Sequence, residues 1–160
     1  MLYHLTFDPN KALSIYDNGL NNSLPNDGTI ELDKMFIRKY GLNHQVVQAR
    51  KQAIYLYYDR YLPSILNQMD RNAYIFRILP EKLDLNKMYV SDQHYLNQIF
   101  DGVATSQKDI EWNLQKYVEH FKHIKDYNED TDNYSYAEHL YLDSIPVQAI
   151  QLVRKPLLNI

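Results

Sequence analysis

Short apolar stretches rich in β-branched and aromatic residues recur along the chain and predict β-strands. The clearest is residues 53–58, which reads Ala-Ile-Tyr-Leu-Tyr-Tyr. The candidate strands are residues 2–6, 53–58, 73–79, 83–90, 138–142 and 151–154. A turn at residues 143–146 and a short segment at 147–150 separate the last two of these strands.

Helical spacing of apolar residues predicts helices between these strands. Residues 12–20 carry such a pattern, preceded by capping side chains in residues 8–10 (Asp-Pro-Asn) and stopped at Gly19. The strongest pattern covers residues 107–125, where Tyr117 belongs to the apolar stripe. Shorter helices are expected at 41–50, 60–69 and 95–100, loops at 21–28 and 126–135, and residues 29–39 are ambiguous.

The order of these elements favours the α+β class, because strands outnumber helices and irregular segments separate most of them. A chain of 160 residues is long enough for one domain with its own core, and no linker or internal repeat divides it. Hydrophobic residues make up 45% of the chain, which argues against disorder. We therefore predict a single domain over residues 1–160.

Composition narrows the chemistry. The chain has no cysteine, which excludes disulfides, thiolate metal sites and cysteine nucleophiles. The formal net charge of -3 argues against a broad basic surface for nucleic acid. No apolar run reaches the roughly 20 residues that span a bilayer, and the first residues lack the layout of a signal peptide. The expected location is the cytoplasm, away from any membrane.

Two further features have more than one interpretation. Positive charge gathers at Lys34, Arg38, Lys39, Arg50 and Lys51, which fits a solvated helix face better than a basic groove. The fifteen tyrosines suit stacking on planar ligands, and they also suit ordinary strand positions.

Other catalytic signatures are weak. His120 and His123 have a spacing compatible with metal binding, but no third ligand is evident, so we predict no metal site. The serines lack a nucleophile-elbow context, and there is no glycine-rich phosphate loop. A Rossmann-type dehydrogenase is therefore not supported.

Three segments stand out by their order along the chain. The first holds His4 and is followed by a helix that ends at Gly19; the second, residues 53–57, holds Tyr55. The third, residues 136–142, holds Glu138 and precedes a proline-containing turn. This order resembles the ADP-ribosyltransferase superfamily in the form whose signature runs His, Tyr, Glu. The subgroup it resembles most is the bacterial toxins that ADP-ribosylate single-stranded DNA.

The resemblance extends over nearly the whole chain and implies a fold of split mixed or antiparallel sheets with flanking helices. It implies that NAD⁺ is the co-substrate and that Glu138 stabilises the ribosyl cation formed when nicotinamide leaves. His4 would donate a hydrogen bond to the adenosine ribose, with Thr6 supporting the same strand. Tyr55, and after it Tyr57, would pack on nicotinamide. The alternatives are a surface ion pair for Glu138 and core positions for the tyrosines.

The same resemblance implies an acceptor-recognition segment before Glu138, and the pyrophosphate contact is assigned separately to a basic side chain. Arg38 or Arg50 would hold the pyrophosphate. Residues 126–135 contain four acids and no aliphatic side chain, so we expect a mobile, exposed loop there. Tyr134 and Tyr136 in and beside it would recognise the acceptor or simply fold onto the surface. Because position 136 is not a carboxylate, modification of arginine is disfavoured.

The function expected from the sequence is therefore the transfer of ADP-ribose from NAD⁺ to a macromolecule, or hydrolysis of NAD⁺. The acceptor would be a single-stranded nucleic acid or a protein, and the setting a bacterial or phage effector or toxin with an antitoxin or defence-system partner. The alternative is a catalytically inactive binding module on the same fold, such as a phage inhibitor of host defence.

Overall fold

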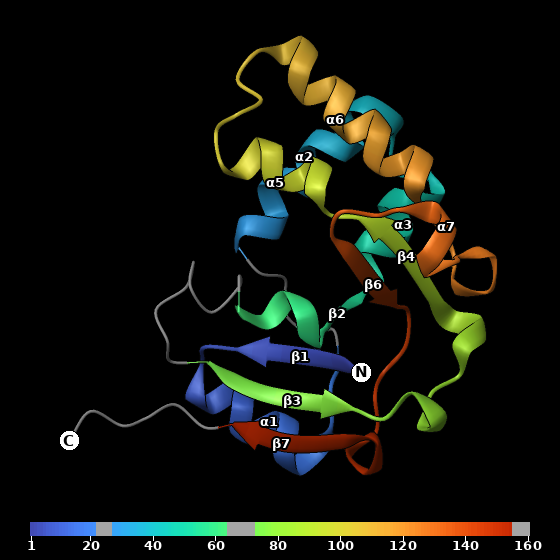
Figure 1. The fold of residues 1–160 in the computed structure, drawn as a ribbon. Coiled ribbons are helices and arrows are strands. Elements are labelled where there is room, and N and C mark those ends of the chain that lie inside the picture. The colour runs from blue at the N-terminus through green and yellow to red at the C-terminus, as the bar shows by residue number, and fades with distance from the viewer. Residues whose placement is uncertain (22–26, 64–72, 155–160) are drawn as a thin grey trace.

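The computed structural model describes residues 1–21, 27–63 and 73–154, and in that part of the chain it has the expected α+β class (Figure 1). The strands are β1 (Leu2–Thr6), β2 (Ile54–Tyr58), β3 (Tyr74–Ile78), β4 (Met88–Asp92), β5 (Lys122–His123), β6 (Ala137–Tyr141) and β7 (Ile150–Arg154). They form one sheet in the order β5-β4-β6-β2-β1-β3-β7, and every neighbouring pair is antiparallel.

The helices gather mainly at one end of this sheet (Figure 1). They are α1 (Pro9–Asn18), α2 (Asp27–Tyr40), α3 (Gln45–Gln52), α5 (His94–Phe100), α6 (Gln107–His120) and α7 (Glu129–Asp132). Short 3-10 turns are η1 (Asp59–Tyr61), η2 (Pro80–Lys82), η3 (Leu85–Lys87), η4 (Ile124–Asp126) and η5 (Val147–Ala149). None of the helices in the described part of the chain has the length and apolar character needed to cross a membrane.

Most strand predictions are confirmed, as β1, β2, β3, β6 and β7. The expected extended segment at 83–90 is wrong in its first half, where η3 precedes β4. There the side chain of Asp84 accepts a hydrogen bond from the Asn86 backbone nitrogen at 3.0 Å and turns the chain. Local capping of this kind competes with extended structure.

The helix predictions are confirmed in type and corrected at their ends. Asp8 caps α1 by accepting from the backbone nitrogen of Asn10 at 2.8 Å, and Gly19 ends it. α6 stops at His120 because Phe121 is extended and leads the chain into the sheet as β5. The ambiguous residues 29–39 belong to α2, which begins two residues inside the predicted loop at 21–28. Most of the predicted helix at 60–69 lies outside the described residues.

The prediction of an exposed loop at 126–135 is confirmed in exposure, since most of these residues are exposed, and wrong in structure, since the segment is partly helical. The segment contains η4 and α7, and Asn128 caps α7 by accepting from the Asp130 backbone nitrogen at 2.9 Å. The carboxylate of Asp92 accepts from the backbone nitrogens of Ser135 and Tyr136, each at 2.9 Å. Hydrogen bonds to neighbouring elements thus order a stretch whose acidic composition indicated mobility.

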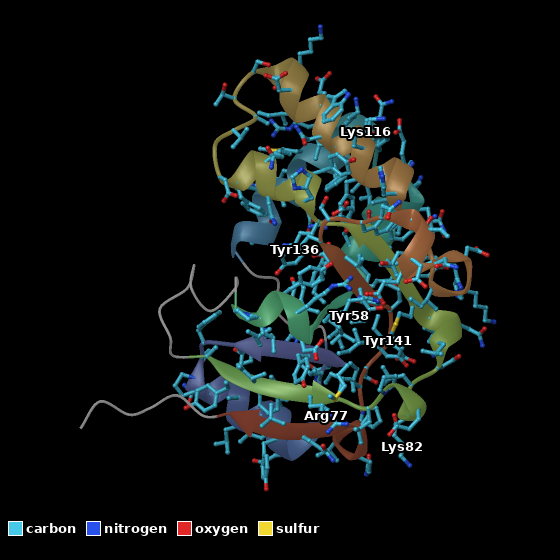
Figure 2. The ribbon with its side chains drawn as sticks, in the orientation of Figure 1. Tyr58, Arg77, Lys82, Lys116, Tyr136 and Tyr141 are labelled. Carbon is cyan, nitrogen blue, oxygen red and sulfur yellow. The ribbon has the colours of Figure 1, made fainter. Side chains whose placement is uncertain are left out.

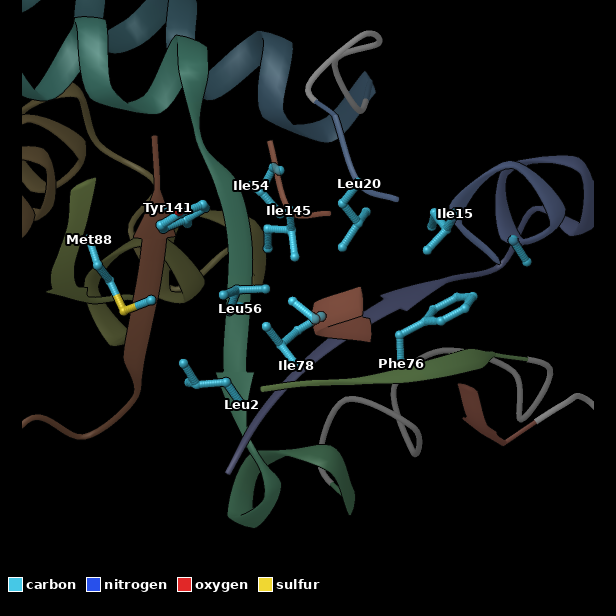
Figure 3. Close-up of a cluster of buried hydrophobic side chains, with 12 residues drawn as sticks. Leu2, Ile15, Leu20, Ile54, Leu56, Phe76, Ile78, Met88, Tyr141 and Ile145 are labelled. Carbon is cyan, nitrogen blue, oxygen red and sulfur yellow. The ribbon is translucent and has the colours of Figure 1, made fainter. Parts of the chain in front are cut away.

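The two faces of the sheet bury different clusters. One face packs against α1 and forms an apolar core that includes Leu2, Ile15, Leu56, Phe76, Ile78, Met88 and Tyr141 (Figure 3). The second cluster joins α2, α3, α5 and α6, and contains Leu32, Phe36, Val46, Val47, Leu96, Leu114 and Tyr117. Strand β6 lies inside the sheet, and all five of its residues are buried.

Gly19 is needed for a close backbone approach. It has a φ of +82°, and a Cβ there would lie 2.4 Å from the carbonyl oxygen of Ile145. Gly41 has a φ of +83° with nothing within 4 Å of the same position. We therefore expect Gly41→Ala to cost about 1 kcal/mol of unfolding free energy from backbone strain alone. Gly19→Ala adds the clash and should cost roughly 3 kcal/mol or more. Urea unfolding of both variants measures the difference, and equal losses would contradict the packing argument.

His139 on β6 makes folding sensitive to acid. It is 1% exposed and meets the ring of Tyr58 edge-on at 4.6 Å between centroids. Burial lowers the pKa of His139 from 6.5 to about 4. The unfolded chain binds the proton of His139 more tightly than the folded chain does. The contribution of the neutral, buried ring to the unfolding free energy is therefore complete above pH 6.5 and is lost as the pH falls toward 4. When the pH falls from 7 to 5, the unfolding free energy of both proteins should decrease. We expect the decrease for His139→Phe to be about 2 kcal/mol smaller than for the unmodified protein. Unfolding free energies that change equally with pH in the two proteins would refute this expectation.

Candidate functional site

The predicted carboxylate, Glu138, lies in the middle of the sheet. On β6 it is directly opposite Tyr57 of β2 and Ser91 of β4. Directly opposed residues in antiparallel strands point to the same face, so Glu138 faces the helices α2, α3 and α6 rather than the α1 side. It is 4% exposed, and the alternative of a surface ion pair is therefore wrong.

Arg50 at the end of α3 is the charged partner of Glu138. Its Nη1 is 3.8 Å from Oε2 of Glu138, and its Nε donates to Oδ1 of Asp33 at 3.1 Å. The guanidinium is packed between the rings of Phe36, Tyr55 and Tyr117, with its carbon 5.1 to 5.5 Å from their centroids. A buried carboxylate is tolerated when a charge is paired with it in this way.

Tyr117 of α6 completes the contact. Its hydroxyl donates to Oε2 of Glu138 at 2.8 Å and accepts from Nη1 of Arg50 at 3.1 Å. Its backbone carbonyl accepts from the hydroxyl of Ser91 at 2.7 Å, and Ser91 stands beside Glu138 in the sheet. Tyr117 thus ties α6 to β4 and also orients the carboxylate of Glu138.

Of the two oxygens of the Glu138 carboxylate, the described residues contact Oε2. Within the described residues its hydrogen bond and its ion pair both go to Oε2, and Oε1 accepts none. Burial raises the pKa of Glu138 above its ordinary value, while Arg50 and the hydroxyl of Tyr117 oppose the rise. The result is a fixed carboxylate with a raised pKa and one oxygen free of protein partners in that part of the chain.

Three predicted tyrosines lie near this carboxylate. Tyr57 is its direct cross-strand neighbour, and Tyr55 is on the same face by alternation. The hydroxyl of Tyr55 donates to the backbone carbonyl of Arg50 at 3.0 Å. The ring of Tyr136 meets Tyr57 edge-on at 6.2 Å and stacks on Tyr61 at 4.1 Å. Figure 2 shows Tyr136 beside the start of β6.

His4 is not on this face. Its neighbour Tyr3 is opposite Tyr57, so alternation turns His4 to the other side. Its Nδ1 donates to the carbonyl of Tyr55 at 3.1 Å, where the ladder between β1 and β2 has ended. Burial lowers the pKa of His4 to about 4, so the ring is neutral. Its buried Nε2 has no partner among the described residues and can only accept, not donate as the sequence led us to expect.

The other predicted contacts are dispersed. Thr6 accepts from the backbone nitrogen of Asp8 at 3.3 Å and shares the face of His4. Arg38 is exposed on α2, whereas Arg50 is 4% exposed and engaged with Glu138. Tyr134 is buried, and its hydroxyl donates to the carbonyl of His120. The structure thus brings Arg50, Tyr55, Tyr57 and Tyr136 to Glu138, and leaves His4, Thr6, Arg38 and Tyr134 elsewhere.

Sequence reasoning missed Tyr117, Asp33, Ser91 and Asp92. Tyr117 lies in the apolar stripe of α6, where the pattern predicts a core residue and says nothing of its hydroxyl. The two aspartates and the serine contact groups distant in sequence, so no local spacing marks them. The only available signal was indirect: polar residues at buried positions need partners.

No group of histidines and acids in the described ranges could hold a metal ion. A surface hollow of about 370 Å³ is lined by Gln48, Lys51, Gln52, Asp143 and Ser144, and so includes none of the residues around Glu138. We therefore place the candidate site at the Glu138 carboxylate on chemical grounds rather than at this hollow.

The chain matches no family model, no curated protein and no solved structure at a significant level. Arguments about its function therefore depend on its own residues and their geometry.

The buried charges predict a distinctive pattern of stability. Arg50→Met leaves Glu138 without a charge partner and should cost about 3–5 kcal/mol of unfolding free energy. Adding Glu138→Gln to that variant removes the unpaired carboxylate, so the double variant should be more stable than Arg50→Met alone. Urea unfolding tests both expectations.

The exposed pair between Lys34 and Glu31 supplies the control, because the two side chains are 59% and 65% exposed. Lys34→Met should leave the unfolding midpoint unchanged. If Arg50→Met behaves like Lys34→Met, the pairing of Arg50 with Glu138 does not stabilise the fold.

Proposed function

We propose that this chain is an NAD⁺-dependent ADP-ribosyltransferase with an ADP-ribosyltransferase-like fold, and that Glu138 is its catalytic carboxylate. The single observation behind the proposal is that Glu138 is buried and oriented through Oε2 by Tyr117 and Arg50. Its Oε1 accepts no hydrogen bond from the described residues. An oxygen left without a protein partner can accept a hydrogen bond from a ligand.

The chemistry follows from this arrangement. Departure of nicotinamide leaves positive charge on the ribose, and a fixed carboxylate beneath the sugar stabilises that charge while Oε1 accepts from a ribose hydroxyl. Arg50 and Tyr117 keep the carboxylate in place, so little reorganisation accompanies the reaction. Tyr57, directly opposite Glu138 in the sheet, supplies a ring against which nicotinamide packs.

Entry of the nucleotide requires a side chain to move, because Glu138 is 4% exposed. Tyr136 is the candidate gate: it lies two residues before Glu138, is only half-buried, and contacts Tyr57 edge-on. Its backbone is held by Asp92, so turning of the ring would end its stacking on Tyr61 and leave the strand fixed. The acceptor, a nucleic acid or a protein in the cytoplasm, would approach from the same side.

Nicotinamide release from NAD⁺ tests the proposal. The purified protein is assayed alone and with cell lysate, single-stranded DNA or RNA. We expect release with at least one additive, and Glu138→Gln should lower kcat at least about 100-fold, since loss of an electrostatic group in the transition state has effects of that size.

Glu129→Gln is the matched control, because Glu129 is a half-exposed carboxylate paired with Arg60 at the surface. It should retain full activity. Release that needs no additive identifies an NAD⁺ hydrolase, and release unaffected by Glu138→Gln excludes Glu138 as the catalytic group.

A second candidate is a binding module that has lost catalysis and holds a cellular partner, as a phage inhibitor of host defence would. The observation in its favour is the burial of both Arg50 and Glu138, each 4% exposed, which suits a closed structural network. Absence of both NAD⁺ binding and nicotinamide release, with an intact biological effect in Glu138→Gln, would establish this candidate instead.

A further inference from the structure

A row of side chains crosses one face of the sheet through Glu138. Direct cross-strand pairing links one residue of each strand to the next, from β7 to β4. The members in order are Gln151, Arg77, Tyr3, Tyr57, Glu138 and Ser91. Because directly opposed residues share a face, the cation of Arg77 and the carboxylate of Glu138 lie on the same side of the sheet.

Arg77 is an arginine without a protein partner in the described ranges. It is half-buried on β3, and its buried Nε makes no hydrogen bond to any described residue (Figure 2). No ion pair of its guanidinium with a described acid exists either. A buried donor of a charged group is costly unless an acceptor satisfies it. Arg50, by contrast, has Asp33, Tyr117 and Glu138.

We propose that Arg77 is the anion subsite of the ligand, binding a phosphate group of a nucleotide that lies across the row. Three strand spacings separate Arg77 from Glu138, or about 14 Å at the usual distance between strands. This is a backbone separation, and the side chains of Arg77 and Glu138 both project from the same face, so one nucleotide can place its reacting ribose at Glu138 and a phosphate at Arg77. Tyr3 and Tyr57 lie between the two ends and form an aromatic surface beneath it. This inference rests on the proposed function, because it takes Glu138 as the reacting end.

Phosphate fits Arg77 for a chemical reason. The planar guanidinium donates two parallel hydrogen bonds to a phosphate, and Nε is one of the donors of that fork. The sequence had suggested Arg38 or Arg50 for the pyrophosphate. Arg38 is exposed on α2 and Arg50 is occupied by Glu138, so Arg77 is the better placed of the three.

Calorimetric binding of three probes tests the subsite: inorganic pyrophosphate, ADP-ribose and adenosine. Arg77→Gln should weaken pyrophosphate and ADP-ribose at least about tenfold, the usual effect of a lost charged hydrogen bond, and leave adenosine unchanged. Arg77→Lys keeps the positive charge but loses the two parallel donors. Its affinities for pyrophosphate and ADP-ribose should lie between those of Arg77→Gln and the unmodified protein. Lys82→Gln is the charge-matched control, since Lys82 is exposed on η2 (Figure 2) and should bind like the unmodified protein. Circular dichroism melting verifies that each variant folds.

The outcomes separate this inference from the proposed function. If pyrophosphate binding depends on Arg77 but no nicotinamide is ever released, the subsite stands and the proposed function fails. If nicotinamide release depends on Glu138 while Arg77→Gln leaves KM and ADP-ribose affinity unchanged, the proposed function stands and the subsite fails. Equal weakening by Lys82→Gln, or no binding of either phosphate probe to the unmodified protein, also overturns the subsite.

Discussion

The pairing of Glu138 with Arg50 is the constraint on which the packing of α2, α3 and α6 against the sheet depends. A carboxylate in the middle of a sheet is tolerated only when charge and hydrogen bonds compensate its loss of water. That compensation comes from Arg50 of α3 and Tyr117 of α6, and Asp33 of α2 in turn pairs with Arg50. The position of each helix against β2, β6 and β4 is therefore tied to one buried charge.

Local patterns predicted the elements well and their contacts poorly. The strand at 2–6, the capping of α1 by Asp8 and the strand that carries Glu138 follow from spacing and capping chemistry, which involve residues near in sequence. The partnership of Tyr117 with Glu138 joins residues far apart, and in the sequence Tyr117 is one more member of an apolar stripe. Composition also gave no sign of the helix α7 within 126–135, or of the hydrogen bonds that Ser135 and Tyr136 donate to the Asp92 carboxylate.

The position of His4 illustrates the same limit. A strand pattern places a residue on one of two faces, but only the pairing of β1 with β2 decides which face Glu138 shares. Pairing through Tyr3 and Tyr57 puts His4 on the opposite side. There its Nδ1 donates to the carbonyl of Tyr55 where the two strands separate, so His4 joins the halves of the sheet. The side chains of Tyr57 and Glu138 therefore share a face that His4 does not.

The two faces of the sheet differ in the character of their side chains. The face toward α1 carries Leu2, Leu56 and Phe76, which bury apolar surface and need no orientation beyond shape. The other carries Arg77, Tyr3, Tyr57, Glu138 and Ser91 in one cross-strand row. Replacement of buried ion pairs by apolar residues is often neutral or stabilising, so stability alone does not account for charges at that depth. In the described residues this row combines a cation without an acidic partner, two aromatic rings and a carboxylate with one oxygen that accepts no hydrogen bond, a combination that suits the anionic, planar ligand proposed above.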